Sequence, residues 1–201
     1  MNSELINQLG EIGANGLPYT IPIHPNLVHL TLGLFIIGIT FDIVGVFFPL
    51  EKWAFKFLAI TVERHQFFHV GWYNIVASAV ITFVTVGAGF YEMLLASPPT
   101  DIKSAWGIPA MQTMIWHGVG GVLLLAVIVG MAVWRGYQRY VSRRYVDREV
   151  GFIYLFAGLF IMFLMYLHGT LGAQLAAEFG VHNTADTLLR AGQDIHNLLK
   201  N

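Results

Sequence analysis

The sequence of 201 residues contains no cysteine and few charged residues, and each shortage excludes a class of function. Without cysteine, the chain forms no disulfide, no thiolate-bound iron–sulfur cluster, no thiolate nucleophile and no covalently attached c-type haem. Only 11% of its residues are charged, against about 25% in an average soluble domain. The net charge of −1 leaves no basic face for nucleic acid. Phosphate-binding loops and hydrolase serine motifs are also missing, so hydrolytic chemistry is not expected.

Long apolar runs dominate what is present. Hydrophobic residues make up 56% of the chain, and its mean hydropathy is +0.62. The run from Asn26 to Phe48 would extend about 34 Å as a helix, which exceeds a hydrocarbon core of about 30 Å. We therefore predict an all-α integral membrane protein, a single four-helix bundle. Its predicted spans are 26–48, 67–96, 110–134 and 150–175.

Two segments outside these spans carry their own patterns. Residues 50–64 are amphipathic and are predicted to lie along the membrane surface. Residues 176–201 form a tail with a short predicted helix, in which His182 and His196 are expected to be solvated. His24, just before the first span, is expected to serve as a helix cap or interfacial group.

Basic residues are distributed unequally between the predicted loops. The two loops on one side, 49–65 and 135–149, hold eight of the eleven Lys and Arg residues. By the positive-inside rule that side is cytoplasmic, so both termini are predicted to be non-cytoplasmic. The eight residues are Lys52, Lys56, Arg64, Arg135, Arg139, Arg143, Arg144 and Arg148.

Two end motifs resemble those of a family of predicted bacterial four-helix membrane proteins of unknown function. Residues 24–29 read His-Pro-Asn-Leu-Val-His, similar to the family's opening His-Pro-x-x-Val-His. Residues 171–175 read Leu-Gly-Ala-Gln-Leu, similar to its closing Leu-Gly-Gly-Glu-Leu, and Gly-Val follows at 180–181. Phe179 departs from the histidine that members often have there. The middle spans look closest to members from photosynthetic bacteria, which implies a bacterial inner or thylakoid membrane but no particular activity.

Three predicted spans each carry one histidine at a similar depth on the non-cytoplasmic side: His29, His117 and His168. A histidine inside a bilayer is costly and needs a partner. Neutral imidazole is a common axial ligand of haem iron, and helical bundles build such sites from facing helices. The spacing therefore predicts a haem b site in which His117 and either His29 or His168 bind the iron.

A glycine follows each of these histidines by four residues, on the same helical face. At these glycines, Gly33, Gly121 and Gly172, a missing side chain would leave room for a flat ring. The same glycines also fit simple helix–helix packing, in which the histidines are hydrogen-bonded and bind no cofactor. Both interpretations remain open at the level of the sequence.

Near the cytoplasmic side, the first span contains one acid, Asp42. An unpaired carboxylate at that depth is expensive, so Asp42 should be protonated or bonded to a neighbour. His69, Tyr73 and Asn74 are the nearest candidates in depth. His69 lies one turn after His65, so both project from one face of a helix. Asp42 and His69 are interpreted either as an interhelix link or as a proton path to a quinone headgroup.

Two classes of function follow. The first is a b-type cytochrome that passes electrons between a quinol and an acceptor on the non-cytoplasmic side. The second is a non-catalytic accessory or assembly subunit of a larger photosynthetic or respiratory membrane complex. In that case a histidine binds chlorophyll through one axial bond, or the protein binds no cofactor. Neither class assigns a catalytic residue, and membrane lipid is a partner in both.

Overall fold

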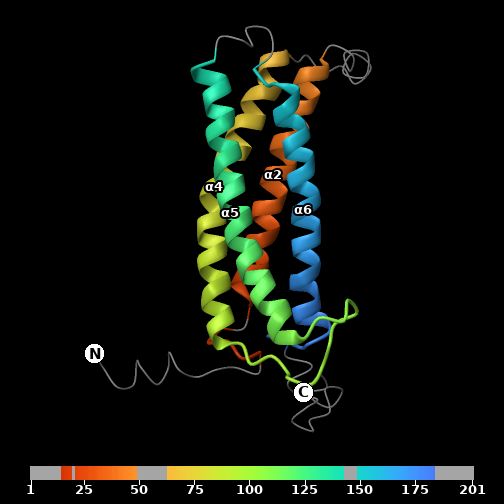
Figure 1. Ribbon diagram of the computed structural model, residues 1–201. Helices are drawn as coiled ribbons and strands as arrows, with labels where there is room; N and C mark the ends of the chain where they lie inside the picture. Colours follow the sequence, from red (N-terminus) through yellow and green to blue (C-terminus); the bar gives the residue numbers. More distant parts are fainter. Residues whose placement is uncertain (1–14, 20, 49–62, 143–148, 184–201) are drawn as a thin grey trace, which may run out of the picture. The chain divides into compact units, whose positions relative to one another are not determined.

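The computed structural model describes residues 15–19, 21–48, 63–142 and 149–183. Within these residues it confirms the predicted all-helical fold, with four helices long and apolar enough to cross a membrane (Figure 1). They are α2 (Ile23–Phe47), α4 (Arg64–Leu95), α5 (Ala110–Tyr140) and α6 (Phe152–Ala177). The surface segment predicted at 50–64 lies almost wholly outside the described residues, as does the tail beyond residue 183.

Proline accounts for several helix boundaries. Pro25 lies in the first turn of α2, where its missing N–H has no helical partner to lose. Helix α5 begins directly after Pro109, and α4 ends at Leu95, ahead of a Pro-Pro pair. Helix α5 continues past the predicted end of its span at residue 134. Arg135, expected in a loop, therefore belongs to the helix.

The chain divides into two compact units, and each of the four helices contributes a segment to both. Unit 1 consists of Met1–Pro25, Gly87–Gly120 and His168–Asn201. Unit 2 consists of Asn26–Val86 and Gly121–Leu167.

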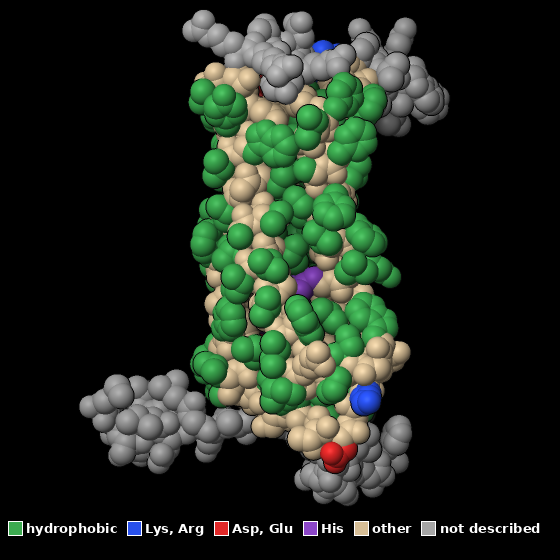
Figure 2. Space-filling view, viewed as in Figure 1, with side chains coloured by type: hydrophobic (Ala, Val, Ile, Leu, Met, Phe, Trp, Pro, Cys, Tyr) green, Lys and Arg blue, Asp and Glu red, His purple; other side chains and the backbone are tan. Residues whose placement is uncertain are grey.

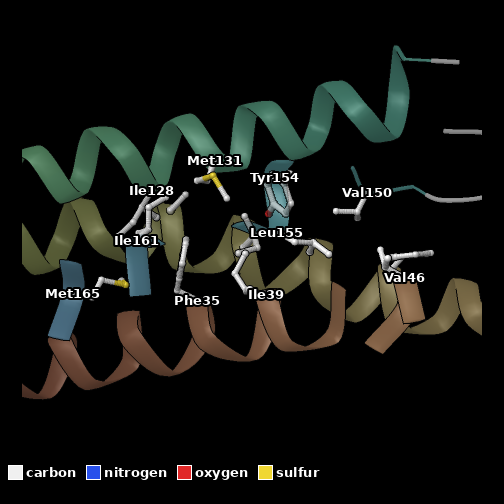
Figure 3. Close-up of a cluster of buried hydrophobic side chains, with 13 residues drawn as sticks. Phe35, Ile39, Val46, Ile128, Met131, Val150, Tyr154, Leu155, Ile161 and Met165 are labelled. Carbon is white, nitrogen blue, oxygen red and sulfur yellow. The ribbon is translucent and has the colours of Figure 1, made fainter. Parts of the chain in front are cut away.

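A cluster of buried apolar side chains forms the core of unit 2. Figure 3 shows Phe35 and Ile39 of α2 pointing into the same interior as Ile128 and Met131 of α5. Between membrane helices such contacts act mainly through close van der Waals packing. The cluster comprises Phe35, Ile39, Val46, Phe68, Ile75, Ala79, Ile128, Met131, Val150, Tyr154, Leu155, Ile161 and Met165.

Helices α2 and α4 approach closely in unit 2 through small and hydroxyl side chains. A Cβ added at Gly38 would lie 2.7 Å from Cγ1 of Ile75, so only glycine fits there without a shift. The Oγ1 atoms of Thr31 and Thr85 are 2.9 Å apart, and the Ser78 hydroxyl donates to the Thr31 carbonyl oxygen at 3.0 Å. Buried hydroxyls that bond across helices are typical of membrane helix packing.

Unit 1 has a smaller apolar cluster. Ala110 of α5, Leu175 of α6 and Phe179 are buried together, with Met114 and Val181 packed against them. Phe179 thus contributes apolar packing at the position where the resembled family often has histidine.

Figure 2 shows one face of the molecule. Hydrophobic side chains cover the middle of the helices, and the visible charged side chains of described residues lie near the helix ends. A histidine side chain reaches this face among the apolar residues. This distribution fits helices surrounded by hydrocarbon, in which charge is confined to the ends.

Candidate functional site

Unit 1 brings together three histidines from three helices. The rings of His117 (α5) and His168 (α6) are stacked, with centroids 4.3 Å apart and planes 5° from parallel. The His24 ring from the first turn of α2 meets His117 edge to face, with centroids 5.9 Å apart and planes at 83°. His24 is therefore more than the cap or interfacial group expected from the sequence.

Each of these rings lies against a glycine of a neighbouring helix. A Cβ at Gly172 would lie 2.8 Å from Cε1 of His117, and one at Gly120 would lie 2.7 Å from Nδ1 of His168. Helices α5 and α6 thus make reciprocal contacts. His117 occupies the space beside Gly172, about one turn from His168, and His168 occupies the space beside Gly120, about one turn from His117. Gly89 of α4 does the same for His24, where an added Cβ would lie 2.7 Å from Cε1.

His117 also carries a buried polar atom with no hydrogen-bond partner. Its Nδ1 is one of three such side-chain atoms among the described residues, together with Tyr154 Oη and Gln174 Oε1. Buried polar groups are normally paired, so an orphaned ring nitrogen is a candidate for binding a ligand. Within the described part of the chain, no group of three or more His, Asp or Glu residues could hold a metal ion.

The other predicted members of the site are placed differently. His29 belongs to unit 2 and its side chain is exposed. A Cβ at Gly33 would meet no atom within 4 Å. Gly121, also predicted to make room for a cofactor, is half-buried. The α5 glycine that contacts a histidine is instead Gly120, three residues after His117 rather than four.

Glu92, near the end of α4, holds the start of α2 in place. Its Oε1 accepts hydrogen bonds from the backbone N–H groups of Ile23 and His24 and from the Tyr19 hydroxyl, each at 2.9 Å. The first N–H groups of a helix have no hydrogen-bond partner within the helix. The Glu92 carboxylate of α4 therefore supplies the missing acceptor for the start of α2. Burial, together with the hydrogen bond to Glu92 and its negative charge, raises the pKa of Tyr19 from 10.0 to about 12.

His182, expected to be solvated, is instead half-buried and in contact with two backbone carbonyl oxygens. Its Nδ1 lies 3.1 Å from the oxygen of Asn15, and its Nε2 lies 2.9 Å from the oxygen of Glu92. The expectation failed because the turn after α6 folds back toward α4 in unit 1, which no local sequence pattern indicates.

In unit 2, Asp42 forms an ion pair with Arg135, and both side chains are fully buried. Arg135 Nε donates to Oδ2 at 2.9 Å and Nη2 donates to Oδ1 at 3.0 Å, the two-pronged geometry that suits guanidinium and carboxylate. The predicted neighbours of Asp42, namely His69, Tyr73 and Asn74, were the wrong partners. The error follows from ending the third span at residue 134, which left Arg135 in a loop.

The pair continues into a network toward the end of α5. Glu149 Oε2 lies 3.6 Å from Arg135 Nη2 and 2.5 Å from Arg139 Nη1. Arg139 Nη2 is 3.0 Å from Nδ1 of His69. The same Nη2 is 3.4 Å from Nε2 of His69, and because guanidinium only donates, a ring nitrogen of His69 accepts this hydrogen bond. His69 therefore joins the network through Arg139, and the network links α2, α4 and α5.

These features define a small helical membrane protein with four candidate spans and buried polar groups in each unit. The chain belongs to the family described as predicted membrane protein (DUF2231), whose model matches residues 20–185. No curated protein and no solved structure matches the chain. The family match covers all four helices, so it supports the architecture and leaves the activity to be argued from the residues.

Proposed function

We propose that this protein binds one haem b through His117 and carries single electrons between a membrane quinol and an acceptor. The observation that carries the proposal is the histidine cluster of unit 1, with its orphaned Nδ1 on His117. Bound haem would supply one-electron redox chemistry, and the histidines that hold it would tune its potential.

The spacing of the rings favours His24 as the second ligand. A haem held by two histidines would need their rings to leave space between them. The rings of His24 and His117, with centroids 5.9 Å apart, are the more widely spaced pair. The rings of His117 and His168, parallel with centroids 4.3 Å apart, pack directly against each other. A role for His29 stays a prediction.

The spectrum of the detergent-purified protein tests the proposal. We expect a Soret band that shifts on reduction by dithionite. His117→Ala should abolish bound haem, His24→Ala should turn a low-spin spectrum high-spin, and His168→Ala should stay low-spin. His65→Ala, which removes an exposed histidine elsewhere, is the matched control. A wild-type spectrum in His117→Ala would contradict the proposal, and a high-spin spectrum in His168→Ala alone would contradict the choice of His24.

The same preparation tests the alternative class. A colourless protein that co-purifies with a larger membrane complex would support an accessory subunit. A chlorophyll spectrum in the organic extract would point to a single axial bond from a histidine to that pigment.

A further inference from the structure

The His182 ring bridges two groups that can only accept hydrogen bonds. Nδ1 faces the carbonyl oxygen of Asn15 at 3.1 Å, and Nε2 faces that of Glu92 at 2.9 Å. A neutral imidazole has a single N–H, so one of these contacts would set a nitrogen lone pair against a carbonyl oxygen. The doubly protonated ring donates to both oxygens.

The backbone on both sides of the ring is preformed for this contact. His182 has a φ of 55°, in the left-handed region that few residues other than glycine adopt. On the other side, the Asn15 side chain accepts from Leu17 N at 3.1 Å and donates to the Tyr19 oxygen at 2.8 Å. Gly16 has a φ of 72°, a conformation that glycine adopts readily, and a Cβ there would be in ordinary van der Waals contact with Nδ1, at 3.5 Å.

Acidic groups predominate on the elements that meet at His182. Glu92 on α4 carries the carboxylate that accepts from Tyr19 and from the start of α2 at His24. Glu178, just after α6, accepts at its Oε2 from Ala105 N at 2.6 Å. Both carboxylates are held by these other donors, so the groups that face the two ring nitrogens are the backbone carbonyl oxygens of Asn15 and Glu92.

We infer that protonated His182 is an acid-stabilised clasp, which ties residues 15–19 to the end of α4 and to the turn after α6. Histidine ordinarily changes charge between about pH 5 and 8. The closed clasp binds the proton, so closure is favoured at low pH and is lost as pH rises. Leu17, fully buried in the closed form, becomes accessible when the clasp opens. The inference does not depend on haem binding.

Thiol labelling of the full-length protein tests the clasp, because the chain has no cysteine of its own. In the Leu17→Cys variant, the rate of maleimide labelling reports the opening of the clasp. This rate is divided by the labelling rate of Ile21→Cys, because Ile21 is 65% exposed. The ratio cancels the effect of pH on thiol reactivity. We expect the ratio to rise about tenfold between pH 5.5 and 8, the effect of losing one hydrogen bond to a charged group. In a His182→Gln background the ratio should be high at both pH values.

His65→Gln is the control, since it removes an exposed histidine from unit 2 and should leave the pH dependence intact. A ratio that does not change with pH, or that changes equally in His182→Gln, would overturn the clasp. Nitrogen NMR of the ring in the otherwise native protein gives a second readout that needs no cysteine variant. Both ring nitrogens should be protonated at pH 6, and a neutral tautomer there would also overturn the inference.

Discussion

At the scale of single residues, the ion pair of Asp42 and Arg135 is the group most sensitive to substitution. Neither side chain reaches solvent, and Arg135 Nη2 also donates to the Phe68 carbonyl oxygen at 3.3 Å. Burying two charges costs several kcal/mol per ion, which the close two-pronged contact offsets. The pair therefore adds more to the specificity of helix pairing than to net stability, and its loss is costly only when one charge remains.

We predict that Asp42→Leu and Arg135→Met each lower the free energy of unfolding by about 3–5 kcal/mol, because each leaves a buried charge without its two-pronged partner. Asp42→Asn should cost less than Asp42→Leu, since the amide oxygen still accepts from Arg135. The double variant Asp42→Leu/Arg135→Met should recover most of the loss. Denaturation in detergent measures all four variants. Glu63→Gln, which neutralises an exposed acid, is the control. Additive losses in the double variant would show that the two residues are not coupled.

Tyr19 gives a prediction for alkaline pH. Its neutral form is favoured in the folded protein, so its contribution to stability is complete below pH 10 and is lost as pH rises through about 12. The tyrosinate absorbance of the native protein minus that of Tyr19→Phe should therefore titrate near pH 12. Glu92→Gln, which removes the neighbouring negative charge, should move that midpoint down toward 10. A native midpoint already near 10 would contradict the contact with Glu92.

At the scale of elements, helix α4 carries a heptad pattern of contact positions. Its positions 68, 71, 75 and 78, then 82, 85, 89 and 92, alternate by three and four residues, the spacing of a helix–helix seam. In unit 2, Phe68 packs on Gly45, and a Cβ at Gly71 would collide with the Asp42 carboxylate. In unit 1, Gly89 and Glu92 contact the start of α2. The pattern mixes glycine, hydroxyl and acidic residues, so an apolar period alone does not reveal it.

The helix glycines supply a matched pair of substitutions. Gly172→Ala should destabilise the protein by about 1–3 kcal/mol, since the new methyl group would lie 2.8 Å from Cε1 of His117. Gly130→Ala, on α5, meets no atom within 4 Å and should stabilise by up to about 1 kcal/mol through helix propensity. Thermal denaturation of both variants in one detergent compares them. Equal stability would mean that the α5–α6 approach is looser than described.

The four helices were predictable because a bilayer fixes the length of an apolar run, so hydropathy alone locates each span. The contact between His117 and His168 was also predictable, since an intramembrane histidine needs a partner. The contacts of His24 and the pairing of Arg135 were not. Both depend on which helices are neighbours and on where a helix ends relative to the hydrocarbon, and neither quantity is encoded in a local pattern.

At the scale of the whole molecule, the structure changes the count of basic residues that predicts topology. Arg135 is a buried partner of Asp42 in α5, so it no longer counts as a free base of the 135–149 loop. Of the eight bases assigned to that side, seven remain, against Lys103, Arg190 and Lys200 on the other. The asymmetry still favours non-cytoplasmic termini, because the positive-inside rule depends on Lys and Arg in short loops.

We therefore predict that a reporter active only outside the cytoplasm works when fused after Asn201, and that the same reporter is silent when inserted at 143–148. A reporter active only in the cytoplasm should give the reverse pair of results, so the two insertion points control each other. Activity of the cytoplasmic reporter at Asn201 would invert the assignment. The start of α2, with His24 and the clasp at His182, would then face the cytoplasm, and the proposed electron acceptor would have to be sought there.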